Sequence, residues 1–92
     1  MGGVIKLSIQ EIIRDFEELV RYEERLDVHF NFKKAKDEDI HDFSKRMEEL
    51  TMKYLPDSMD MLVKDAADDY ERGLILYRTL HENFVEIFQK LV

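Results

Sequence analysis

The sequence predicts an all-α protein, a small helical bundle with two medium helices and one long C-terminal helix. Apolar residues recur every three or four positions through most of the chain, which is the spacing of one helix face. Glycine and proline are scarce, at three residues and one residue. Helix start and stop signals separate the periodic segments. We therefore expect residues 1–92 to form a single helical domain.

The first helix is predicted over residues 9–26. Ser8 and Glu11 form a capping-box pattern, in which the serine hydroxyl accepts from the backbone N–H of Glu11 and the carboxylate reaches back. The apolar stripe that follows consists of Ile9, Ile12, Ile13, Phe16, Leu19 and Val20.

The segment that follows the first helix alternates apolar and polar residues, a period of two that is typical of a strand. One interpretation is an extended connector that covers the end of the bundle. The other is a minor two-stranded β element in which Val28–Phe32 pairs with Val4–Leu7, because a lone strand needs a partner.

The second helix is predicted over residues 38–55. The acidic run Asp37–Asp39 favours a helix start, because carboxylates interact well with the positive end of the helix dipole. Pro56 ends the helix. The apolar positions between these signals are spaced three and four apart: Ile40, Phe43, Met47, Leu50 and Tyr54.

The third helix is predicted as one continuous element over residues 58–91. Apolar or small residues alternate at spacings of four and three from Met59 to Leu91. Gly73 lies inside this pattern and costs about 1 kcal/mol relative to alanine in a helix. No other turn residue flanks Gly73, so a bend there is favoured over two separate helices.

The C-terminal half of this helix predicts self-association. Its apolar residues cover more than half of the helix circumference, and two shorter helices offer too little surface to bury them all. A homodimer is favoured over a different protein partner or a compact monomer. The predicted interface consists of Ile75, Leu76, Leu80, Phe84, Val85, Phe88 and Leu91.

Charge and composition exclude several classes of protein. With 14 basic and 21 acidic residues the net charge is −7, which argues against binding to a nucleic-acid backbone. The absence of cysteine excludes disulfides and Cys-ligated metal centres. The N-terminal segment lacks the pattern of a secretory signal, and the apolar runs are too short to span a membrane. A cytoplasmic location is expected.

Acidic residues concentrate between residues 57 and 71. They predict a solvated surface, a docking surface for a basic partner, or a mimic of the spaced phosphates of DNA. The last interpretation would make the protein an acidic nucleic-acid-mimic inhibitor. This acidic patch consists of Asp57, Asp60, Asp65, Asp68, Asp69 and Glu71.

No motif predicts catalysis, a cofactor or a metal. Glu38 and His41 have the Glu-x-x-His spacing of di-iron helical bundles, but a second such pair is missing. The predicted function is therefore that of a non-enzymatic interaction or assembly protein. The alternative from another class is a metal- or nucleotide-dependent bundle enzyme that uses acidic helix faces.

Two segments resemble a known family. The run Asp69–Tyr77 resembles the second-helix motif of the small subunit of bacterial exodeoxyribonuclease VII, and Phe16–Leu19 is similar to its first helix. The resemblance implies a helical accessory chain that coats a larger nuclease subunit. It covers roughly 20 residues of 92. In that family the two segments are close in sequence, whereas here the predicted helix Glu38–Leu55 separates them, so no site residue is carried over.

Overall fold

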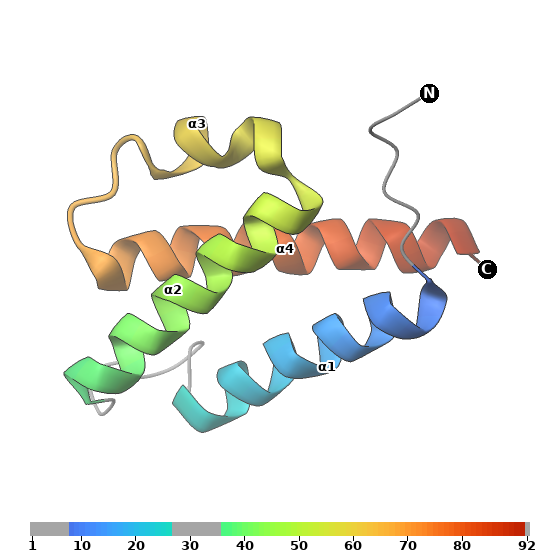
Figure 1. The fold of residues 1–92 in the computed structure, drawn as a ribbon, viewed down its shortest axis with the longest axis horizontal. Coiled ribbons are helices and arrows are strands. Elements are labelled where there is room, and N and C mark those ends of the chain that lie inside the picture. The colour runs from blue at the N-terminus through green and yellow to red at the C-terminus, as the bar shows by residue number, and fades with distance from the viewer. Residues whose placement is uncertain (1–7, 27–35, 92) are drawn as a thin grey trace.

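The computed structural model describes residues 8–26 and 36–91 and confirms an all-α bundle (Figure 1). No strand occurs in these two ranges, and the pairing of Val4–Leu7 with Val28–Phe32 lies outside them. The elements in chain order are α1 (Ile9–Leu26), α2 (Asp37–Tyr54), a 3-10 turn (Pro56–Ser58), α3 (Met59–Val63) and α4 (Asp69–Leu91).

Helices α1 and α2 begin and end close to the predicted positions. The backbone N–H of Glu11 donates to the Ser8 hydroxyl at 3.1 Å, which is half of the predicted capping box. Helix α2 begins at Asp37 with three acidic residues in its first turn. It ends just before Pro56, as the loss of a backbone N–H at proline requires.

The prediction of one continuous helix over residues 58–91 is wrong. The chain leaves the helical path after Val63 and resumes it at Asp69. Asp68 caps α4, because its carboxylate accepts from the backbone N–H of Glu71 at 2.9 Å and its carbonyl accepts from that of Arg72 at 3.0 Å. The break lets α3 fold back beside the first half of α4, where Met59, Leu62 and Val63 pack against the core (Figure 1).

Gly73 lies at a close approach of α2 and α4. A Cβ atom added there would lie 2.9 Å from both Cδ2 and Cε2 of Phe43 and 3.2 Å from the Cα of Ser44. Helix α4 is continuous through this residue. The glycine therefore serves a close helix crossing and does not mark a bend or a break.

The core lies around this crossing. Rings of Phe43 and Tyr77 pack at a centroid distance of 6.2 Å, and those of Tyr54 and Phe84 at 5.0 Å. Helix α1 packs against the side of this crossing and contributes Leu19 and Leu26 to the core. The buried apolar residues are Leu19, Leu26, Phe43, Met47, Leu50, Leu76, Tyr77, Leu80 and Phe84.

We predict that Gly73→Ala lowers the free energy of unfolding by about 1–2 kcal/mol, although alanine is the better helix former by roughly 1 kcal/mol. The new methyl group would press on the buried ring of Phe43. Urea denaturation measures the change. In the double variant Gly73→Ala/Phe43→Leu the two costs should be less than additive. A Gly73→Ala protein more stable than the wild type would contradict the close approach.

Candidate interaction surface

The interface between α1 and α4 is formed by aromatic rings. The Phe16 ring of α1 lies 5.9 Å from the His81 ring, 5.5 Å from Phe84 and 5.3 Å from Phe88 by centroid distance. Further along, the Tyr77 hydroxyl donates to the Glu23 carboxylate. Residue numbers thus rise along α1 as they fall along α4, and the two helices are antiparallel (Figure 1).

An apolar strip flanks this aromatic contact on the outside of the molecule. On α1, Ile13 and Val20 lie three and four residues from Phe16, and so share its side of the helix. On α4, Val85 lies four residues after His81 and three before Phe88. We name this strip the α1/α4 face and define it by its members: Ile9, Ile13, Phe16, Val20, His81, Val85 and Phe88.

Several side chains of the α1/α4 face remain in contact with water. Ile9 is 54 % exposed, Ile13 is 42 % exposed and Val85 is 37 % exposed. Phe88 and His81 are half-buried. Aliphatic side chains that gather on both sides of a half-covered aromatic row are typical of a surface that another protein covers.

Three residues of the predicted interface lie in the core of the single chain. Leu76, Leu80 and Phe84 have no exposed surface, because α1 and α2 of the same chain already cover them. Val85 and Phe88 do lie on the α1/α4 face. For Leu91 only the backbone belongs to the described part of the chain.

Ile75 lies on a different side of α4. It precedes Thr79 by four residues, and Thr79 lines a depression with Leu55 and Leu62 at the boundary with α3. The predicted interface residues are therefore divided between the core and two separate flanks.

Ile9 and Ile13 are exposed, although their periodicity places them in the apolar stripe of the first helix. The stripe from Ile9 to Val20 has the ordinary width of an amphipathic helix face, and its periodicity does not say which edge stays exposed.

The opposite flank of α1 is closed by polar contacts with α2. The buried carboxylate of Asp15 accepts from the Tyr54 hydroxyl at 2.5 Å and from the Lys53 ammonium at 2.8 Å. Arg46 holds the Glu18 carboxylate with two hydrogen bonds, of 2.6 and 2.8 Å. Because these groups satisfy one another, this flank offers little to a partner.

Burial and carboxylate partners raise the pKa of one tyrosine on α2 and of one tyrosine on α4. Burial, the hydrogen bond to Asp15 and the charge of that carboxylate raise the pKa of Tyr54 well above its usual value. Burial and the hydrogen bond to Glu23 raise the pKa of Tyr77 in the same way. Both hydroxyls therefore keep their protons, and their hydrogen bonds to α1, at neutral pH.

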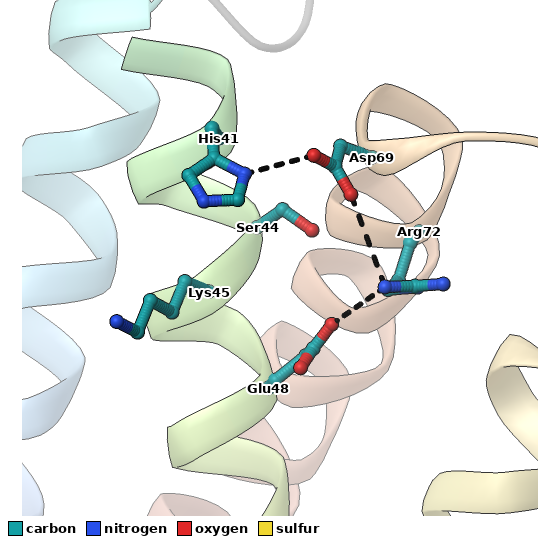
Figure 2. A pocket seen from close by; sticks show the side chains of 6 residues that line it. All are labelled: His41, Ser44, Lys45, Glu48, Asp69 and Arg72. Carbon is teal, nitrogen blue, oxygen red and sulfur yellow. Dashed lines mark hydrogen bonds and ion pairs between the residues drawn. The ribbon is translucent and has the colours of Figure 1, made fainter. Parts of the chain in front are cut away.

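A polar cluster joins α2 to the first turn of α4 (Figure 2). His41 Nδ1 lies 2.9 Å from Asp69 Oδ2, and Arg72 Nη1 donates to Glu48 Oε1 at 3.0 Å. Ser44 completes a Ser, His and Asp set, but Figure 2 shows its hydroxyl pointing away from the His41 imidazole. The hydroxyl is buried and makes no hydrogen bond, so the set provides no path from serine to histidine for a proton.

The acidic patch is distributed over several elements. Asp57 lies in the 3-10 turn, Asp60 in α3, Asp65 and Asp68 in the connection, and Asp69 and Glu71 in the first turn of α4. Two of the six have structural partners, since Asp68 caps α4 and Asp69 holds His41. The patch is not the single helix face that a continuous helix would have presented.

Residues 8–26 and 36–91 bring no three His, Asp or Glu side chains into a group that could hold a metal ion. Within the same ranges, no helix combines the length and apolar character needed to cross a bilayer.

Comparison of the chain with protein-family models, curated proteins and solved structures finds no match. The segments that resemble the exodeoxyribonuclease VII small subunit fall on α1 and on the start of α4, with the whole of α2 between them. The α1/α4 face is thus the candidate site on geometric grounds.

We predict that the bundle loses stability as the pH rises above the ordinary tyrosine pKa of ~10. The unfolded chain then releases tyrosine protons that the folded chain retains at Tyr54 and Tyr77, so deprotonation favours unfolding. Urea denaturation at pH 8 and about pH 11 measures the loss. The double variant Tyr54→Phe/Tyr77→Phe should show a smaller loss between these pH values. An equal loss in both proteins would refute the assignment.

Proposed function

We propose that this protein is a non-enzymatic assembly protein that self-associates through the α1/α4 face. The observation that carries the proposal is the exposure of Ile9, Ile13 and Val85 beside a half-buried aromatic row. Full burial of an aliphatic side chain of this size contributes roughly 1.5–3 kcal/mol, and a contact that completes the burial of these partly exposed side chains gains a part of that for each.

The small size of the chain supports a second copy as the partner. A 92-residue chain buries a limited part of its surface when it folds alone, and association with a copy adds burial without a second gene product. Each border of the face also carries one exposed charge at the same level, Glu24 on α1 and Arg78 on α4, and these two charges are opposite. A surface with this arrangement is complementary to itself.

The contact with the second copy is made by the exposed flank of α4, and not by the core residues of that helix. Leu80 and Phe84 stabilise the single chain, and the flank that carries Val85 and Phe88 binds the copy. The acidic patch then belongs to the solvated surface. The polar cluster around His41 serves to join α2 to α4.

We predict that Val85→Asp and Ile13→Asp each convert the protein to a monomer with unchanged helix content. Each places a charge in the apolar contact, while the exposed position tolerates the carboxylate in the folded chain. Light scattering measures the molar mass, and circular dichroism measures the helix content.

The matched control is Met61→Asp on α3, a side chain that is 81 % exposed and lies outside the α1/α4 face. This variant should keep the mass of the wild type. A wild-type protein with monomer mass at concentrations up to about 1 mM, where an association of only ~4 kcal/mol would be seen, would overturn the proposal.

A further inference from the structure

We infer that the two copies pair as an isologous four-helix bundle in which Glu24 of each copy contacts Arg78 of the other. This inference rests on the proposed function and adds its symmetry, its register and the ion pair that selects the partner. It follows from the positions of Glu24 and Arg78 at the borders of the α1/α4 face.

Both residues lie at the outer edges of the face. Glu24 follows Val20 by four residues, so it lies at the edge of α1 that points away from α4. Arg78 precedes His81 by three residues and Val85 by seven, so it lies at the outer edge of α4. Both side chains are exposed, and neither has an ion-pair partner among residues 8–26 and 36–91.

Glu24 and Arg78 also lie at the same height along the bundle. Their preceding neighbours, Glu23 and Tyr77, are joined by a hydrogen bond across the two antiparallel helices. Each chain thus presents an apolar strip with a negative charge on one side and a positive charge on the other, level with each other.

A two-fold axis parallel to the helices preserves height and exchanges the sides of the strip. It brings α1 of one copy against α4 of the other and places Glu24 opposite Arg78 twice in the dimer. A two-fold axis across the helices would bring α1 against α1, so that Glu24 would face α1 of the copy and Arg78 would face α4. The two opposite charges would then not meet, and the axis parallel to the helices is favoured.

Charge reversal at one position tests this register. In a homodimer of Glu24→Arg, arginine faces Arg78 twice, and in a homodimer of Arg78→Glu, glutamate faces Glu24 twice. Each variant should self-associate at least about tenfold more weakly than the wild type. Sedimentation equilibrium measures the dissociation constants, and circular dichroism checks that both exposed substitutions leave the fold intact.

Mixing the two variants provides the decisive measurement. In the mixed dimer both pairs again join opposite charges, so the affinity should return to within about threefold of the wild type. The matched control is Glu17→Arg, which reverses a charge on the same border two helical turns from Glu24. Mixed with Arg78→Glu it should give no such recovery, because the new charges lie about a Debye length apart.

The outcomes separate the two proposals. A wild-type protein that dimerises, with Glu24→Arg and Arg78→Glu that do not recover on mixing, would overturn this register and leave self-association intact. Recovery with Glu17→Arg as strong as with Glu24→Arg would overturn it as well. A wild-type protein that is monomeric throughout would overturn the proposed function itself.

Discussion

The close approach of α2 and α4 at Gly73 organises this molecule. The Phe43 ring and the Ser44 backbone occupy the space that a side chain at position 73 would need. Met47 and Leu50 of α2 lie in one core cluster with Leu76 and Leu80 of α4, and all four are at most 1 % exposed. The main apolar side of the C-terminal helix is thereby used within one chain, and any association has to use what remains.

The helices are held together by two different kinds of contact. Helices α2 and α4 are joined mainly by apolar packing, whereas α1 adds to its buried Leu19 and Leu26 a set of carboxylates that meet Lys53, Tyr54 and Arg46 of α2. This polar contact turns one flank of α1 toward α2. The other flank, with Ile9 and Ile13, is left beside α4. The α1/α4 face therefore results from the polar contacts that orient α1 against α2.

The helices of the N-terminal half could be predicted from the sequence because their signals are local. The Ser8 and Glu11 cap, the acidic start of α2 and Pro56 each act within a few residues. The break before α4 was missed because the apolar spacing of four and three continues through Lys64–Asp68 whether or not the chain is helical there. Asp68 was the local signal, as an N-cap residue.

Gly73 and the interface show a second limit of periodicity. The pattern identifies residues that need burial, but it does not say which surface buries them. Leu76, Leu80 and Phe84 were therefore assigned to a partner, although α1 and α2 cover them. From the sequence, Gly73 is only a residue of low helix propensity. The ring that occupies the space of its missing side chain belongs to Phe43, which is 30 positions away in the sequence.

Native-state hydrogen exchange of the Val85→Asp variant tests the central claim most directly, because this substitution removes the proposed contact between copies. The slowest amides should lie in α2 around Met47–Leu50 and in α4 around Gly73–Leu80, and should exchange only through global unfolding. The amides of α1 should exchange faster, because α1 packs against α2 and α4 less extensively than those two helices pack against each other. Protection of α1 that equals or exceeds that of α2 and α4 would contradict the dependence of the fold on the Gly73 crossing.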